Sequence, residues 1–142
     1  CLQDKPMAFM IQAYTRVAFR VDNTSYHAGS METPVSINVA NEIVFQRVYS
    51  IANATNTLVY NDELAQFEFL YIAADFNTRL ELTDGNSDTF SINLLGTAVS
   101  GKYGLPFILG SDVTTNSTSY INTCRVYNTS GSTANVFVLA AD

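Results

Sequence analysis

The segment that most constrains the fold lies near the end of the chain. In residues 125–140, two runs of β-branched and aromatic residues flank a tip of Ser, Thr, Asn and Gly. Residues 47–60 repeat this pattern, and both copies open with Arg-Val-Tyr. Residues 79–95 have the same form around Asp84-Gly85-Asn86-Ser87-Asp88. Polar tips between alternating apolar runs predict β-hairpins. Three predicted hairpins in a chain of 142 residues indicate an all-β domain.

Period-two alternation continues through most of the remaining sequence. Residues 7–21 predict one long strand or two short ones, and residues 22–30 predict a loop. Residues 67–73 carry apolar residues on both faces towards their end, which predicts a central strand. Residues 105–109 predict a short strand, which Pro106 marks as an edge strand or a strand start, and residues 96–104 predict a glycine-rich loop.

The whole pattern predicts one domain. We expect an antiparallel β-sandwich or jelly-roll-like barrel of about 8–10 short strands over residues 1–142. Residues 1–10 are the candidate for an extended arm.

Composition excludes several classes of function. Charged residues make up 14% of the chain, well below the usual level of about 25%, so Ser, Thr and Asn must build much of the surface. The net charge is −6, and the seven basic residues are scattered, which argues against a nucleic-acid partner. No apolar run approaches the roughly 18–20 residues of a membrane span.

Candidate catalytic residues are few. His27 is the only histidine, and no serine lies in a Gly-x-Ser-x-Gly motif. Zinc would need three or four ligands of types that are scarce here. We therefore expect no enzyme and no cofactor. The acidic residues available for two-carboxylate chemistry show no marked pair; they are Asp62, Glu63, Glu68, Asp75 and Glu81.

Calcium is the better metal candidate. Asp84, Asn86 and Asp88 match the opening of an oxygen-ligand loop, and they would be the ligands. Thr89 and Leu95 then stand where an EF-hand requires Gly and Glu. The turn preference of Asp and Asn explains the same residues without a metal.

Two cysteines permit a single disulfide between Cys1 and Cys124. Inside a strand, Cys124 is interpreted as a small buried hydrophobic residue. Cys1 stands where an acylated lipoprotein cysteine would stand, but a cleavage boundary is the preferred explanation, because no signal peptide is visible to support a lipid anchor. Sequons occur at Asn23, Asn53, Asn116 and Asn128.

The style of the hairpins resembles small β-rich virion proteins of tailed bacteriophages, which decorate or cement capsids or build tail parts. Residues 79–85, 100–107 and 128–136 carry this resemblance. It implies a non-enzymatic subunit, often trimeric, docked on a lattice of other virion subunits.

The leading hypothesis is therefore a capsid decoration or cement protein, located in the virion, that acts through contacts with itself and with a capsid or tail protein. Edge strands and apolar sheet faces need cover, and neighbouring subunits supply it. The candidate assembly contacts are Met7, Phe9, Met10 and Ile11. Deleting residues 1–10 is expected to weaken assembly, as measured by light scattering, and to leave the β-fold intact.

The alternative is a secreted or surface-attached binding module, such as an adhesin, a pilus subunit or a glycan-binding domain. Trp, the residue best suited to stacking on sugars, is absent, although eight tyrosines are present.

Overall fold

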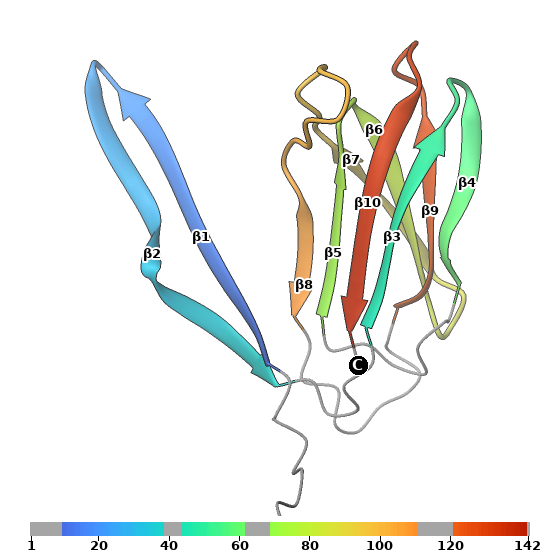
Figure 1. The fold of residues 1–142 in the computed structure, drawn as a ribbon, viewed down its shortest axis with the longest axis horizontal. Helices are drawn as coiled ribbons and strands as arrows, with labels where there is room; N and C mark the ends of the chain where they lie inside the picture. Colours follow the sequence, from blue (N-terminus) through green and yellow to red (C-terminus); the bar gives the residue numbers. More distant parts are fainter. Residues whose placement is uncertain (1–9, 39–43, 62–68, 111–120, 142) are drawn as a thin grey trace, which may run out of the picture.

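The computed structural model describes residues 10–38, 44–61, 69–110 and 121–141. These residues form ten β-strands and no helix, so none of the described segments is a helix that could cross a membrane. Eight strands build a sandwich of two four-stranded antiparallel sheets, and the first two strands form a separate hairpin (Figure 1). The predicted all-β antiparallel fold is confirmed.

The strand order of the two sheets is that of a jelly roll. One sheet has the order β3-β10-β5-β8 and the other β4-β9-β6-β7. Apart from the step from β6 to β7, each strand crosses to the opposite sheet from its predecessor. The bounds of the first sheet are β3 Val44–Ile51, β10 Ala134–Ala141, β5 Phe69–Ala74 and β8 Phe107–Gly110. Those of the second are β4 Thr55–Asn61, β9 Ile121–Asn128, β6 Thr78–Asp84 and β7 Thr89–Leu94.

The core lies between the two sheets and follows the alternation in the sequence. In β10, Val136 and Val138 point inward and are fully buried, as are Leu80 of β6 and Val126 of β9. Burying each such side chain contributes about 1.5–3 kcal/mol. Strand β5 lies between two neighbours and is almost entirely buried, which confirms the prediction of a central strand.

The predicted hairpins had different outcomes. Strands β6 and β7 pair directly around the turn at residues 84–88, so that hairpin is confirmed. The hairpins predicted for residues 47–60 and 125–140 are wrong, because β3 and β4 belong to different sheets, as do β9 and β10. Alternation shows that a strand has one buried face, but it does not identify the strand that supplies the hydrogen bonds. Both segments are arches that connect the two sheets across the core.

The two arches lie against each other. The N–H of Ala54, in the β3–β4 arch, donates to the carbonyl oxygen of Asn128 at 2.7 Å. In return, the N–H of Gly131 in the β9–β10 arch donates to Asn53 Oδ1 at 2.8 Å. The two similar sequence segments are therefore neighbours in space.

Strands β1 (Met10–Val21) and β2 (Thr24–Asn38) form a long antiparallel hairpin, which we call the arm. Its turn is Asp22-Asn23, both with positive φ (49° and 65°), as a two-residue hairpin turn requires. The predicted loop at residues 22–30 is wrong, because β2 already begins at Thr24. A two-stranded ribbon outside the sandwich does not need an apolar run in each strand. The small polar residues at the start of β2 therefore have the composition of a loop, which explains the wrong prediction.

The arm diverges from the sandwich along its length (Figure 1). At its foot, Ile11 packs against a small buried cluster formed by Phe69 and Ala141. The register shifts between Ala13 and Thr15, opposite residues 31–34 of β2. Such irregularities bend a ribbon, and β2 is bent at this point in Figure 1.

Candidate interaction surface

The outer face of the β3-β10-β5-β8 sheet carries no charged side chain among its described outward positions. These positions alternate with the core residues of each strand. Several are well exposed; Val48 is 59% exposed and Ile108 38%. We call this surface the uncharged face. It consists of Gln46, Val48, Ser50, Phe69, Tyr71, Ala73, Ile108, Asn135, Phe137, Leu139 and Ala141.

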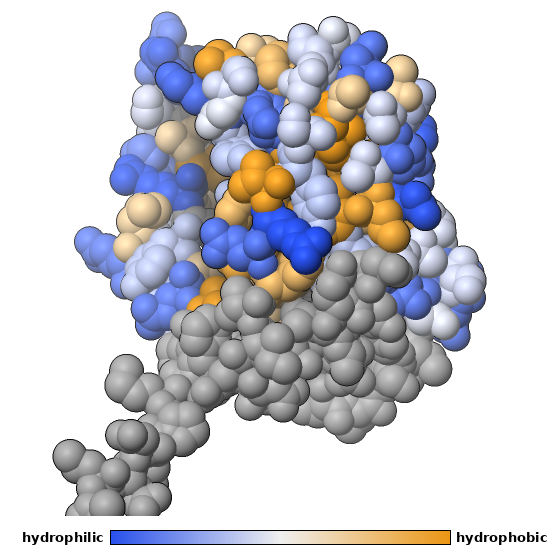
Figure 2. Space-filling view, turned by 45° about the vertical axis from the view of Figure 1, so that its right-hand side comes forward, coloured by the Kyte–Doolittle hydropathy of each residue, from blue (hydrophilic) through white to orange (hydrophobic). Residues whose placement is uncertain are grey.

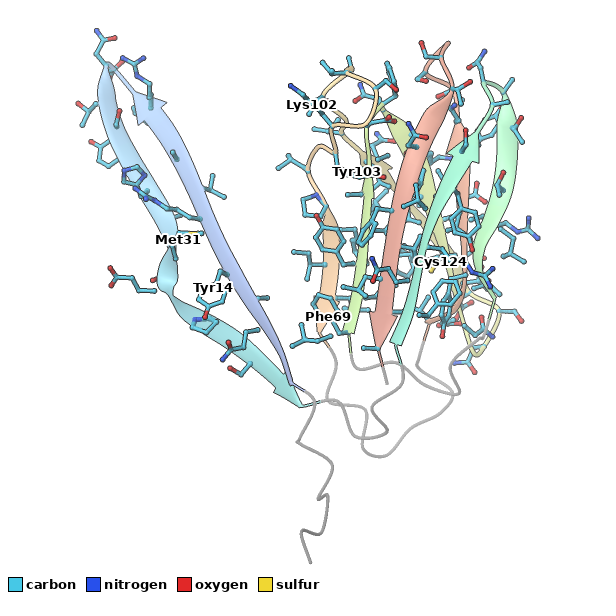
Figure 3. All side chains as sticks on the ribbon, viewed as in Figure 1. Tyr14, Met31, Phe69, Lys102, Tyr103 and Cys124 are labelled. Carbon is cyan, nitrogen blue, oxygen red and sulfur yellow. The ribbon has the colours of Figure 1, made fainter. Side chains whose placement is uncertain are left out.

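Aromatic rings form the centre of the uncharged face. The rings of Tyr71 and Phe137 meet edge to face, with centroids 5.8 Å apart. Tyr103, from the loop before β8, lies with its centroid 5.9 Å from that of Phe137. Together with Leu139 they line a shallow depression of about 280 Å³. In Figure 3, Phe69 lies near the foot of this sheet, Tyr103 lies towards the other end, and Lys102 lies beyond it.

The loop that carries Tyr103 is held in place by Asp75, whose side chain is fully buried. Its carboxylate accepts hydrogen bonds from the N–H of Gly101 at 2.9 Å, the N–H of Asn135 at 2.7 Å and Asn135 Nδ2 at 2.8 Å. Burial acts to raise the pKa of Asp75, but these hydrogen bonds outweigh it, so this pKa lies below its ordinary value. Burial and the charge of Asp75 raise the pKa of the Tyr103 hydroxyl.

The outer face of the other sheet is polar and charged. Arg79 pairs with Glu81 at 2.9 Å, and its guanidinium lies 5.2 Å from the centre of the Tyr127 ring. A depression of about 330 Å³ lies on this face. The lining residues of the depression are Asn77, Thr78, Arg79, Asn93, Leu95, Tyr127 and Thr129.

In a view of the molecule turned by 45° from that of Figure 1, hydrophobic residues reach the surface of the sandwich between hydrophilic ones (Figure 2).

The outer half of the arm is amphipathic. Val17 pairs with Ala28, and Val21 pairs with Thr24, so these residues share one face with Tyr26. On this face, Val17 is 59% exposed, Val21 52% and Tyr26 47%. The opposite face carries Arg16, Arg20 and His27. Lower on the arm, the exposed side chains of Tyr14 and Met31 lie well away from the sandwich (Figure 3).

The residues considered for catalysis do not come together. His27 is exposed on the charged face of the arm, and Cys124 is buried in the sandwich core, as predicted. Asp75 is a structural carboxylate, and Glu81 pairs with Arg79. Within the described ranges, no group of three or more His, Cys, Asp or Glu could hold a metal ion. Asp62, Glu63 and Glu68 lie outside those ranges.

The turn proposed for calcium is held by its own hydrogen bonds. Asp84 Oδ1 accepts the backbone N–H of Asn86 and that of Asp88, each at 2.9 Å. Ser87 has a positive φ of 67°, a conformation that short polar residues reach most easily in a turn. These hydrogen bonds account for Asp84 without a metal, so Asp84, Asn86 and Asp88 stay a weak calcium candidate and no metal is predicted here.

Of the predicted assembly contacts, Met7 and Phe9 lie outside the described residues, and Met10 opens β1. Ile11 packs at the foot of the arm. Sequence reasoning missed Tyr26 as part of an exposed apolar face and missed the outer face of the sandwich. The signal for that face was the nearly continuous apolar run in β5 and β10, which is typical of strands covered on both sides.

The sequons fall in different environments. Asn128 is fully buried, and its side chain makes four hydrogen bonds, so the folded protein offers no room for a glycan there. Asn23 lies in the exposed turn of the arm, and Asn53 Oδ1 binds Gly131. Asn116 lies outside the described residues.

Comparisons with known proteins give little further information. No protein-family model matches the chain, and no curated protein matches it. A solved structure from a study titled "Bacillus endospore appendages form a novel family of disulfide-linked pili" is similar, with a TM-score of 0.39 and 14% sequence identity. The similarity covers 70% of this chain and 86% of that one. A similarity at this level assigns no function, so the proposals below depend on the surfaces described above.

Proposed function

We propose that this protein is a non-enzymatic structural subunit that assembles with itself through the uncharged face. The observation that carries this proposal is the lack of charged side chains among the described outward residues of one sheet, while the opposite face carries Arg79, Glu81 and Arg125. Exposed aromatic and aliphatic clusters of this kind mark interaction surfaces, and the centre of an interface is typically rich in Tyr and Phe and poor in charge.

A matched pair of substitutions tests the proposal. Val48→Asp places a charge on the uncharged face, at a side chain that is already 59% exposed, so the core is unaffected. Ser91→Asp places the same charge on the exposed polar face and serves as the control. In size-exclusion chromatography with light scattering, we expect the wild type and Ser91→Asp to form oligomers and Val48→Asp to dissociate. A wild type that stays monomeric at every concentration contradicts the proposal.

The location we propose for this subunit is the virion surface, as the style of residues 79–85 and 100–107 suggests. A subunit of an extracellular or cell-surface structure is the alternative. Sedimentation separates them, because a virion subunit is expected to co-purify with nuclease-resistant particles of constant density. Recovery only in a surface fraction without such particles favours the alternative.

A second candidate, a glycan-binding module, is favoured by the depression on the polar face. Asn77 and Asn93 offer amide groups there, and Tyr127 offers an aromatic ring, which together suit sugar hydroxyls and ring faces. A glycan array compares the wild type with Asn93→Ala, using Ser91→Ala as the control. Binding that is lost only in Asn93→Ala supports this function, and no binding by the wild type counts against it.

A further inference from the structure

We infer that the arm of one copy covers the uncharged face of a second copy, an inference that rests on the self-assembly proposed above. The first reason is that the arm needs a partner surface. An isolated two-stranded hairpin is at best marginally stable in water. Here Val17, Val21 and Tyr26 are about half exposed on one side of such a hairpin. The arm therefore carries an apolar strip that its own sandwich does not cover.

The second reason is that the charges of the arm would stay in water. Arg16, Arg20 and His27 lie on the opposite side of the ribbon from Val17 and Val21. The uncharged face carries no described ionic group that would be left unpaired. Docking these two surfaces therefore buries apolar side chains without the desolvation penalty of a buried charge.

The third reason is size. Strand β1 has 12 residues, and at about 3.4 Å per residue it is roughly 40 Å long. Strand β10 has 8 residues and is about 27 Å long, so one arm can span the whole face. A two-stranded ribbon is about 10 Å wide, so along the roughly 27 Å of this face it covers about 270 Å². Counting both surfaces and both arms of a mutual exchange gives roughly 1,100 Å², which clears the size of about 1,000 Å² that a specific interface needs.

The foot of the arm indicates a second copy as the occupant. Ile11 is anchored on Phe69 and Ala141, beside the aromatic cluster of the uncharged face. From that anchor the arm leads away from its own sandwich (Figures 1 and 3). The chain itself buries Phe69, Ala73 and Ala141 of this face, while Val48 and Ile108 stay exposed. Each copy thus presents one exposed apolar strip and one partly exposed face, and two copies related by a twofold axis can cover both.

Cross-linking between differently tagged copies tests this arrangement. Both copies carry Cys1→Ser, while Cys124 is fully buried and shielded from maleimides. One copy carries Val21→Cys, and the other carries Val48→Cys or, as the control, Ser91→Cys. A short bismaleimide is expected to join the two tags in the Val48→Cys mixture and not in the Ser91→Cys mixture.

The alternative outcomes are distinct. Oligomers in light scattering without this cross-link would overturn the inference and leave the proposed assembly standing. A third sample is a single chain that carries both Val21→Cys and Val48→Cys. If the cross-link forms only within that chain and not between copies, the arm covers its own face, which would also overturn the inference and leave the proposed assembly standing. A monomeric wild type would overturn both proposals.

A charge in the strip gives an independent readout. Val21→Asp is expected to raise the dissociation constant of the assembly about tenfold or more, because it would bury an unpaired charge against the uncharged face. Ser25→Asp, which lies on the charged side of the arm, is the control and should have little effect. Equal effects of the two substitutions would contradict the inference. Circular dichroism confirms that each variant keeps its β-structure.

Discussion

Asn128 donates a 2.8 Å hydrogen bond from Nδ2 to the carbonyl oxygen of Ile51, across 77 positions of sequence. Asn128 Nδ2 also donates to the carbonyl oxygen of Ser132 at 2.7 Å, and Oδ1 accepts the N–H and the hydroxyl of Ser130. One buried amide therefore ties the β9–β10 arch to itself and to the β3–β4 arch. A buried polar side chain stabilises the fold only when all of its hydrogen-bonding groups have partners, as those of Asn128 do.

The first prediction concerns this amide. Asn128→Asp keeps the size of the side chain but sets a carboxylate against two carbonyl oxygens, so we expect it to lower the free energy of unfolding by about 3 kcal/mol. The exposed acceptor Asn53 gives the control, because Asn53→Ala removes only one hydrogen bond and should cost about 1 kcal/mol. Urea denaturation measures both, and equal losses would mean that Asn128 has no special role.

The second prediction concerns acid stability. The pKa of Asp75 in the folded protein lies below the ordinary value of 3.8, so its carboxylate stabilises the fold fully above about pH 4. This contribution is lost as the pH falls below 3.8 through the lower folded-state pKa. Asp75→Asn replaces one carboxylate oxygen by an NH₂ group, which would face the N–H groups that now donate to Asp75. We expect this substitution to lower the free energy of unfolding by about 2 kcal/mol at neutral pH.

The measurement is urea denaturation over a pH series from neutral to acid. The loss of stability below about pH 4 should be shallower in Asp75→Asn than in the wild type, because one coupled titration is removed. The control is Glu32→Gln, which removes an exposed carboxylate on the arm and should follow the wild-type curve. Identical curves for all three proteins would rule out this role for Asp75.

The third prediction compares two glycines of the loop that carries Tyr103. A Cβ at Gly104 would collide with the backbone of Leu95 and Gly96, whereas a Cβ at Gly101 would meet nothing nearby. Gly101 has a positive φ of 78°, so Gly101→Ala should cost about 1 kcal/mol through backbone strain alone. Gly104→Ala should cost about 3 kcal/mol, because the backbone must move. Thermal unfolding ranks the two variants, and the reverse order would contradict the close approach.

The fourth prediction concerns the calcium candidate. Asp84 Oδ1 already holds the β6–β7 turn through two backbone N–H groups, so Asp84→Ala should cost about 1 kcal/mol in the absence of calcium. Adding calcium or a chelator to the wild type should leave the unfolding temperature unchanged. A calcium-dependent rise that disappears in Asp88→Ala would instead establish Asp84, Asn86 and Asp88 as ligands.

The Arg-Val-Tyr repeat shows how far the sequence could be interpreted. Its two copies were correctly predicted as strands before polar tips. In β3, however, Tyr49 packs against the core and Val48 points outward, whereas in β9 Val126 is fully buried and Tyr127 points outward. The same three residues are turned to opposite faces. The tripeptide fits either orientation, because the neighbours of each strand in its sheet decide which face is buried.

The sequence by itself determined most of the strands, the turn at Asp84 and the central position of β5, because alternation and turn chemistry act over a few neighbouring residues; the first half of β2, which lacks alternation, was predicted as a loop. Only the tertiary structure decided that two predicted hairpins are arches, that the first two strands form an arm, and that Tyr103 packs beside Tyr71 and Phe137 of the uncharged face. These features depend on contacts between residues far apart in the chain. Local preferences carry no information about such contacts, since many pairings of the same strands bury a similar apolar area.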